Sequence, residues 1–202
     1  MSLRILIAED IDLVAEAFEV LLSTEPTFEV VARVCKGSDV VDAVRLHQPD
    51  VAVVDVDMPG MTGIEAAAAL TANKSPCRVL LLTALPGSGH LHSALAAGAS
   101  GYLLKSTTGA RLIEAIRSVA LGRTVIDPEL AADALRIGPN PLTDRERDIL
   151  RLLDDGHSTD DIAAHLFLSR GTVRNYLSSA MAKLNASGRI EAIHAARTNG
   201  WI

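Results

Sequence analysis

The sequence predicts two domains: a doubly wound α/β domain with a parallel sheet of five strands, followed by an all-α domain of four helices. Short apolar runs alternate with longer amphipathic stretches through the first 120 residues, which is the pattern of βαβ units. From Leu142 onward the pattern is helical only, and a segment rich in glycine and proline separates the two parts. Aromatic residues make up only 3% of the chain, so Ala, Val and Leu must fill the cores, which suits helices packed on a parallel sheet.

The five predicted strands are continuous apolar runs, as expected for strands covered by helices on both faces. They are residues 3–8, 28–34, 51–54, 79–82 and 101–104. Helical patterns lie between and after them, at residues 12–23, 38–47, 62–72, 89–97 and 108–120. Five such repeats predict one small doubly wound domain.

The segment 122–141 interrupts this alternation. It contains Gly122, Pro128, Gly138, Pro139 and Pro141, and these residue types commonly end regular structure. A short helix is expected within it, at 129–136. We therefore predict the α/β domain at residues 1–121, a linker at 122–141 and the helical domain at 142–202.

The C-terminal part has the layout of a helix-turn-helix domain. Thr143 can cap its first helix, and Glu146 three residues later completes a capping box. Gly156 ends that helix, and Ser169 can cap the third. The remaining helices are expected at about 159–166, 170–184 and 187–199. A short helix, a turn and a longer helix in this order are typical of helix-turn-helix proteins.

The charge is distributed unevenly along the chain. Residues 1–141 contain 11 basic and 17 acidic residues, a net charge of −6, whereas residues 142–202 contain 8 of each. Basic residues gather toward the end of the second part, at Arg170, Arg174, Lys183, Arg189 and Arg197. A net-acidic protein can still bind nucleic acid through one basic face, although such a face is often only a solvated helix surface.

Neither the cysteines nor the apolar segments suggest a metal centre or a membrane protein. Cys35 and Cys77 lie far apart and lack metal-ligand spacing, so we expect two reduced, buried thiols. The N-terminal segment has no long apolar stretch of a signal peptide, and no apolar run approaches the roughly 20 residues that cross a bilayer. We predict a soluble cytoplasmic protein with no membrane partner.

Polar residues follow four of the predicted strands. Glu9 and Asp10 follow the first, Asp55 the third, Thr83 the fourth and Lys105 the fifth. Ligands of open parallel sheets bind beyond the carboxyl ends of the strands, so these side chains should converge. Converging carboxylates need a cation, and hard oxygen ligands suit Mg²⁺. One carboxylate can attack a phosphoryl group, and the hydroxyl and ammonium groups can then hold its oxygens.

Each of these residues alone is a weak signal, because a single acid after a strand is more often a helix cap. Their combination resembles the receiver domains of response regulators across residues 3–120. The resemblance is carried by Glu9-Asp10, Val53–Gly63, Thr83-Ala84 and Gly98–Lys105. It implies a flavodoxin-like (CheY-like) fold.

The resemblance also implies a role for each residue of the site. Asp55 is the implied phosphoacceptor, and Glu9 and Asp10 hold Mg²⁺ together with Asp55 and the backbone carbonyl of Asp57. Thr83 is implied to hydrogen-bond the phosphoryl group and Lys105 to pair with it. The remaining position is Tyr102, which occupies the family's aromatic switch position.

A rival hypothesis from another class is a phosphatase of the haloacid-dehalogenase type, because Asp55-Val56-Asp57 also follows an apolar strand. Those enzymes need Asp-x-Asp followed by x-Thr or x-Val, usually on the first strand. Here Met58-Pro59 follows, and the strand is the third. We therefore favour a phosphoacceptor rather than an enzyme, with slow self-dephosphorylation left open.

The third helix of the C-terminal part has two distinct faces. Its apolar stripe comprises Val173, Leu177, Ala180, Met181 and Leu184, and its polar face Arg170, Thr172, Arg174, Asn175, Ser178 and Ser179. Hydroxyl, amide and guanidinium groups suit phosphates and base edges in a major groove. Taken alone, this face is more often an ordinary solvated surface.

The motifs of the C-terminal part resemble the LuxR/FixJ/NarL-type DNA-binding domain across residues 142–202. They are Leu142-Thr143, Arg145-Glu146, Gly156, Ile162-Ala163, Leu166, Leu168-Ser169, Thr172–Arg174 and Lys183-Leu184. The resemblance implies base contacts by Arg174, Asn175 and Ser178, and phosphate contacts by Ser169, Thr172 and Lys183. Tyr176 is a departure, because histidine is common there in the family. The segment 169–178 is closest to the DesR-like branch, but we do not carry over that branch's target genes.

These observations predict a two-component response regulator. Its partners would be a sensor histidine kinase, double-stranded promoter DNA and a second copy of the chain after phosphorylation, with RNA polymerase as a further candidate. The alternatives are a DNA-binding protein with a vestigial receiver, which the complete pocket disfavours, and a signalling adaptor without DNA output, which the complete C-terminal domain disfavours.

Overall fold

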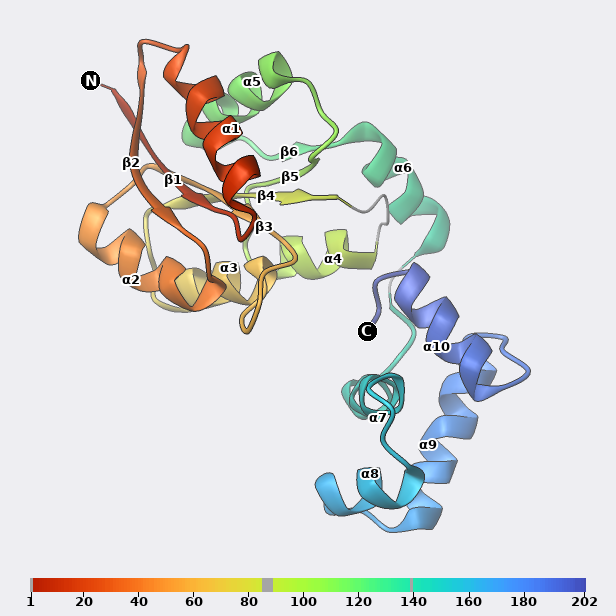
Figure 1. The fold of residues 1–202 in the computed structure, drawn as a ribbon. Coiled ribbons are helices and arrows are strands. Elements are labelled where there is room, and N and C mark those ends of the chain that lie inside the picture. The colour runs from red at the N-terminus through yellow and green to blue at the C-terminus, as the bar shows by residue number, and fades with distance from the viewer. Residues whose placement is uncertain (1, 85–88, 139) are drawn as a thin grey trace. The chain divides into compact units, whose positions relative to one another are not determined.

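The computed structural model describes residues 2–84, 89–138 and 140–202. The chain divides into two compact units (Figure 1). The first runs to Ala132, apart from a short segment before Leu91, and the second extends from Asp133 to Ile202.

The first unit is built on a parallel sheet in the strand order β2-β1-β3-β4-β5-β6. Its strands are β1 (Leu3–Ala8), β2 (Phe28–Val34), β3 (Val51–Asp55), β4 (Arg78–Thr83), β5 (Gly101–Leu104) and β6 (Val125–Ile126). The first five have the flavodoxin-like order, which confirms the predicted fold class. The sixth was not predicted: it is only two residues long and pairs with β5 at the edge of the sheet.

Helices cover both faces of this sheet (Figure 1). They are α1 (Asp12–Ser23), α2 (Gly37–His47), α3 (Gly63–Ala72), α4 (Gly89–Ala96) and α5 (Gly109–Ala120). Figure 1 shows α1 and α5 on one face and α2, α3 and α4 on the other. The predicted bounds of these helices differ from the observed ones by at most one residue at each end.

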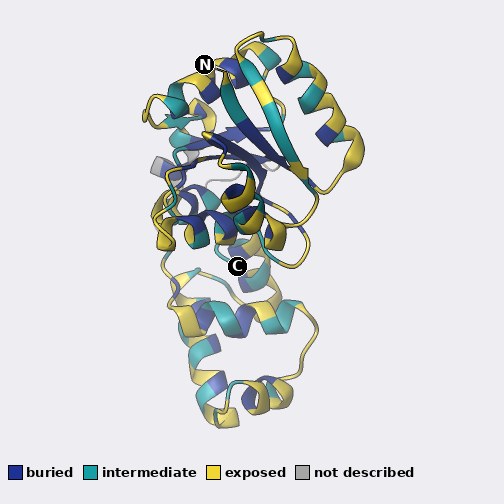
Figure 2. Cartoon of the chain, turned by 90° about the vertical axis from the view of Figure 1, so that its left-hand side faces the viewer, coloured by how far each residue is buried: buried dark blue, intermediate teal, exposed yellow. Residues whose placement is uncertain are grey.

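Alternate residues of the central strands supply the two apolar layers, which lie in the interior of Figure 2. Ile5, Val53, Leu80 and Leu103 belong to the layer that packs with α1 and α5. All are almost fully buried, and this packing fixes the sheet with its polar residues at the carboxyl ends of the strands. Cys77 is also buried, but Cys35 directly follows the edge strand β2 and is exposed, so the prediction of two buried thiols was wrong for Cys35.

The segment predicted as a linker contains regular structure. After β6 the chain forms α6 (Pro128–Ile137), close to the short helix expected at 129–136. Since the first unit ends at Ala132, this single helix continues from the first unit into the second.

The second unit contains α7 (Asp144–Asp154), α8 (Thr159–His165), α9 (Arg170–Lys183) and α10 (Arg189–Thr198), as predicted. Thr143 caps α7 in a capping box with Glu146, and Ser158 and Asp161 form a second box at α8. Its core contains Ile149, Leu150, Ile162, Val173, Leu177, Ala180, Ala192 and Ala196.

None of the helices in the described part of the chain is both long and apolar enough to cross a membrane.

Candidate phosphoacceptor site and DNA-binding surface

Three carboxylates meet at the carboxyl ends of β1 and β3. One oxygen from each of Glu9, Asp10 and Asp55 can be chosen so that all lie within 4.8 Å of one another. Glu9 and Asp55 are buried, with exposures of 2% and 4%, whereas Asp10 is exposed. The sheet topology explains the convergence, because β1 and β3 are hydrogen-bonded neighbours although 46 residues separate Glu9 from Asp55.

Lys105, which follows β5, bridges two of these carboxylates. Its Nζ lies 2.8 Å from Glu9 Oε2 and 3.0 Å from Asp55 Oδ2. Burial lowers the pKa of the Lys105 ammonium, but its hydrogen bonds to Glu9 and Asp55 raise it, and the net pKa lies above the ordinary value. The lysine is therefore a fixed positive charge in the site.

A single ammonium does not fully compensate the carboxylates. Burial raises the pKa of the Glu9 carboxyl, Lys105 offsets part of the shift, and the Asp55 carboxylate adds to it, so that the pKa of Glu9 stays above its usual value. A further cation would lower the free-energy cost of keeping these carboxylates ionised. Three carboxylates with one exposed member form a donor set that suits Mg²⁺, which keeps several of its waters. Asp57, whose backbone carbonyl was predicted to be a further ligand, lies two residues beyond β3 and is exposed.

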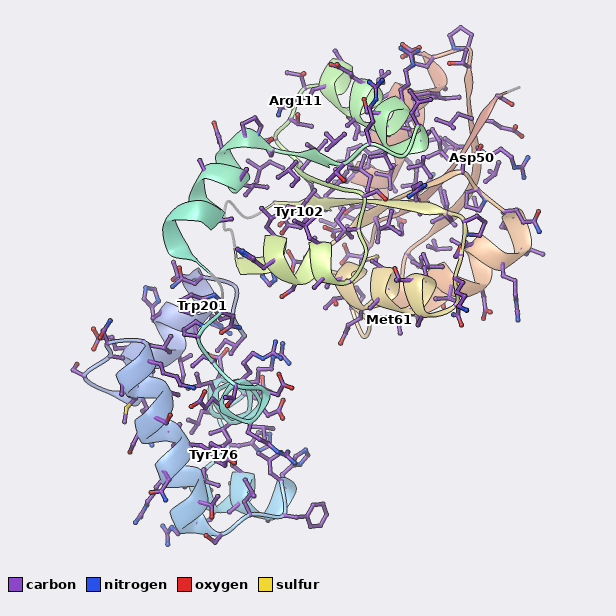
Figure 3. All side chains as sticks on the ribbon, turned by 180° about the vertical axis from the view of Figure 1, so that it is seen from behind. Asp50, Met61, Tyr102, Arg111, Tyr176 and Trp201 are labelled. Carbon is purple, nitrogen blue, oxygen red and sulfur yellow. The ribbon has the colours of Figure 1, made fainter. Side chains whose placement is uncertain are left out.

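Thr83 and Tyr102 form the buried side of the site. Thr83 ends β4 and is 1% exposed, and Tyr102 lies on β5 with no exposed surface. Figure 3 labels Tyr102 within the first unit. Burial raises the pKa of the Tyr102 hydroxyl far above its usual value, and the neighbouring Thr83 side chain only partly opposes the shift. The two hydroxyl-bearing residues that are predicted to respond to the phosphoryl group are therefore neighbours.

The predicted DNA-contacting residues lie on α9 and at its two ends. Arg174, Asn175 and Ser178 are exposed on one helix surface, whereas Val173 and Leu177 face the core. At the start of the helix, Ser169 Oγ accepts a hydrogen bond from the amide of Thr172 and lies 2.8 Å from its hydroxyl oxygen. The Ser169 hydroxyl therefore already caps α9 and also bonds the Thr172 hydroxyl, with Ser169 exposed and Thr172 half-buried.

Lys183, at the end of α9, is held within the unit. Its Nζ donates to Glu146 Oε2 at 2.7 Å, and Ser179 Oγ donates to Glu146 Oε1 at 2.6 Å. Glu146 is only 2% exposed. Burial opposes its ionisation, but hydrogen bonds from Lys183, Ser179 and the Thr143 amide lower the pKa of Glu146 to about 2.

This Glu146 cluster (Thr143, Glu146, Ser179 and Lys183) was missed from the sequence. Glu146 was recognised only as a capping residue, and its ion-pair partner lies 37 residues away. The pairing gives Lys183 a role within the domain that does not require DNA, and its predicted phosphate contact stays a prediction.

The chain matches two family models that together cover most of its length. Residues 5–117 match the response regulator receiver domain, and residues 140–196 match the bacterial regulatory proteins of the luxR family. The transcriptional regulatory protein DesR of Bacillus subtilis (strain 168) is 43% identical over 199 residues, covering 98% of each chain. The uncharacterized transcriptional regulatory protein YvfU of the same strain is 40% identical over 200 residues, covering 99% of this chain and all of the relative.

A solved structure agrees with these matches. The response regulator ChrA of a heme-sensing two-component system has a TM-score of 0.60 and is 33% identical, with 100% of this chain and 99% of that chain covered. With both domains matched in order and relatives aligned over nearly the whole length, this chain belongs to the response regulators that combine a receiver domain with a LuxR-family DNA-binding domain.

Proposed function

We propose that the chain is a transcription regulator that accepts a phosphoryl group on Asp55 and then binds promoter DNA through α9. The observation that carries this proposal is the convergence of Glu9, Asp10 and Asp55 on Lys105, in a receiver joined to a LuxR-family domain. We assign residues 1–121 to the receiver, 122–141 to a linker that contains β6 and α6, and 142–202 to the DNA-binding domain. An Asp55→Asn chain that still gained DNA affinity from a phosphodonor would refute this function.

In this proposal an oxygen of the Asp55 carboxylate attacks the phosphorus of the donor. The phosphorus–oxygen bond forms as the bond to the donor's leaving group breaks, and a sensor histidine kinase would be the donor in the cell. Glu9, Asp10, Asp55 and the Asp57 carbonyl would hold Mg²⁺, which neutralises charge on the phosphoryl oxygens.

The neighbouring side chains then act on the product. Lys105 already lies 3.0 Å from Asp55 Oδ2 and would pair with a phosphoryl oxygen. Thr83 would donate its hydroxyl to another oxygen, and the adjacent Tyr102 would respond to that change. Slow self-dephosphorylation is compatible with this site, because the phosphoryl group would lie beside exposed Asp10.

Removing the exposed carboxylate of the cluster should weaken Mg²⁺ binding. Asp10→Asn is expected to raise the dissociation constant for Mg²⁺ about tenfold or more, because the ion loses a charged oxygen ligand. Isothermal titration calorimetry with Mg²⁺ alone measures this. Asp12→Asn, which removes an acid from the first turn of α1, is the matched control. Equal affinities for the two variants would contradict the assignment of Asp10 as a ligand.

On the DNA side, Arg174 and Asn175 would read base edges from the first turns of α9, with Ser178 on the same surface. Ser169 and Thr172 would contact phosphates at the start of the helix. Lys183 would be a further phosphate contact, because its ammonium pairs with buried Glu146 while 35% of its side chain stays exposed. RNA polymerase is a further proposed partner, and the cytoplasm the proposed location.

Phosphorylation is expected to convert monomers into dimers. The apolar residues of α1 and α5 can either pack inward or form an interface. Leu112, Ile116 and Val119 are buried and Phe18 packs against the core, whereas Leu13 is 76% exposed. Val20, seven residues further along α1, is 67% exposed, so the two apolar side chains lie on one side of this helix, which favours a self-complementary patch that includes α1.

Sedimentation velocity with and without a small phosphodonor and Mg²⁺ tests this expectation. The phosphorylated chain should sediment as a dimer at micromolar concentration, and Leu13→Ser should weaken that dimer. An unchanged monomer after demonstrated phosphorylation would contradict the prediction.

A further inference from the structure

Asp127 lies at the junction between β6 and α6 and is 6% exposed. Its Oδ1 accepts a hydrogen bond from the Glu129 amide at 3.1 Å, so the side chain caps α6, and Pro128 occupies the first helical position. Both are strong signals for a helix start. The backbone amide of Asp127 donates to the carbonyl of Tyr102 at 2.9 Å. One buried residue thus connects the start of α6 to the middle of β5.

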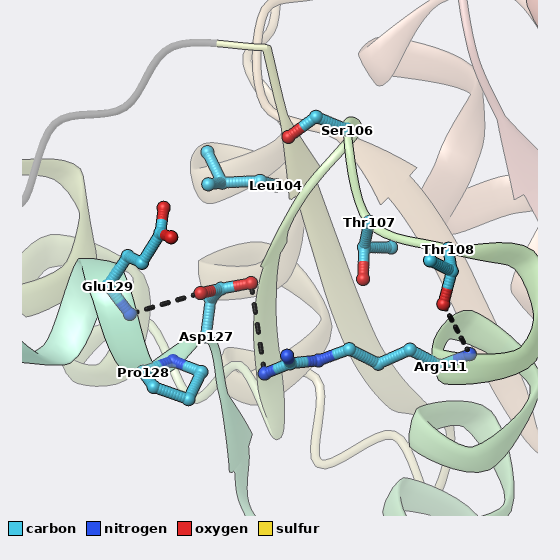
Figure 4. A pocket seen from close by; sticks show the side chains of 8 residues that line it. All are labelled: Leu104, Ser106, Thr107, Thr108, Arg111, Asp127, Pro128 and Glu129. Carbon is cyan, nitrogen blue, oxygen red and sulfur yellow. Dashed lines mark hydrogen bonds and ion pairs between the residues drawn. The ribbon is translucent and has the colours of Figure 1, made fainter.

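A third element reaches the same carboxylate. Arg111 of α5 places Nη2 3.9 Å from Asp127 Oδ2 (Figure 4). The distance exceeds a hydrogen bond, so this ion pair is loose and leaves room for either closer approach or separation. Arg111 itself is held near the cap of α5, where its amide donates to Thr108 Oγ1 at 3.3 Å.

A cavity of about 380 Å³ lies around this pair (Figure 4). Its lining includes Ser106, Thr107 and Thr108 on one side and Asp127, Pro128 and Glu129 on the other. The first of these groups directly follows Lys105. The loop after the phosphoryl-pairing lysine and the start of α6 therefore face one cavity.

We propose that Asp127 is a positioning residue that couples the state of the Asp55 site to helix α6. This inference rests on the proposed function. β5 carries Tyr102 and leads to Lys105, and both would change partners when Asp55 is phosphorylated. A shift of β5 and of the loop 106–108 acts on Asp127 through the Tyr102 carbonyl and through Arg111. Since α6 continues into the second unit, the start of this helix is where such a shift would reach the DNA-binding domain.

The coupling requires that Asp127 interact differently with its neighbours in the two states. The loose Arg111 pair supplies this difference, because its Coulomb energy changes as the loop and α5 move relative to β6. The cap of α6 does not need to change, so the helix can turn as a unit while it remains formed.

The test compares phosphorylation with DNA binding in the full chain. Asp127→Ala removes the cap and the charge, Asp127→Asn keeps a capping side chain but removes the charge, and Arg111→Gln removes the partner. Glu129→Gln is the matched control, because it neutralises an exposed carboxylate that lines the same cavity. Glu129 bonds Asp127 through its backbone amide, which the substitution leaves in place. The probe is a duplex selected from a random library by the phosphorylated wild-type chain.

All variants should take up phosphate as the wild type does. The ratio of DNA affinities with and without phosphorylation should fall about fivefold or more for the Asp127 and Arg111 variants, and stay unchanged for Glu129→Gln. A purely structural role would weaken DNA binding equally in the phosphorylated and unphosphorylated chain. The ratio of affinities would then stay at its wild-type value, which would overturn the proposal. A wild-type chain that is phosphorylated without gaining DNA affinity would overturn the coupling but not the assignment of Asp55. A wild-type chain that takes no phosphate would overturn both.

Discussion

Lys183→Ala is expected to lower the free energy of unfolding of the DNA-binding domain by about 3 kcal/mol, because it leaves the buried Glu146 carboxylate without its cation. The carboxylate is 2% exposed, so its charge would be left in the interior of the domain. Trp201, the only tryptophan of the chain, packs against this core, so its fluorescence during urea unfolding reports on this domain.

The control is Arg189→Ala, which removes an exposed cation from the first turn of α10. It should shift the unfolding transition by a few tenths of a kcal/mol at most. If both variants unfolded alike, the Glu146 cluster would not stabilise the domain, and the proposed phosphate contact would be the remaining role of Lys183.

The pH dependence of unfolding provides a second test of the Glu146 cluster. The folded-state pKa of Glu146 is lowered from 4.5 to about 2, so its contribution to stability is complete above pH 4.5 and is lost as the pH falls toward 2. In Lys183→Ala the pKa of Glu146 should lie closer to 4.5, so the variant should lose less stability than the wild type as the pH falls.

Arg174→Ala is expected to relax base preference at one position of each half-site. Arginine at this point of a recognition helix favours guanine, and a good bidentate contact contributes about 1–3 kcal/mol of discrimination. Arg174 is exposed on α9, whereas Arg170, at the start of the same helix, pairs with Asp160 at 2.7 Å. Selection of bound duplexes from a random library, at several salt concentrations, measures the preference directly.

Arg170→Ala is the control and should leave the preferred sequence unchanged. If Arg174→Ala also kept the wild-type base preference but weakened binding to all sequences equally, Arg174 would contact only phosphate. Retention of the preference would therefore contradict direct reading of a base by this residue.

The fold could be predicted from the sequence because each signal was local. The central strands β3 and β4 are mainly apolar runs, and Thr143 with Glu146 marks the start of α7 within a few residues. The convergence of Glu9 and Asp55 was also predictable, since the carboxyl ends of neighbouring parallel strands meet by geometry.

The features that were missed depend on contacts between distant residues. β6 has only two residues, and its pairing with β5 decides its conformation, so no periodicity can reveal it. The pairing of Lys183 with Glu146 follows from how α9 crosses α7. One local signal was overlooked: Asp127-Pro128 is a capping residue followed by proline at the first helical position, which marks the start of α6.

The most direct test of the central claim is to locate the phosphoryl group. The wild-type chain is incubated with Mg²⁺ and a small phosphodonor, and the modified residue is mapped by mass spectrometry after conversion of the acyl phosphate to a stable derivative. The account predicts one modified side chain, Asp55, with labelling lost in Asp55→Asn and in EDTA but retained in Asp50→Asn. Full labelling of Asp55→Asn, or a phosphoryl group on another residue of the wild-type chain, would contradict it.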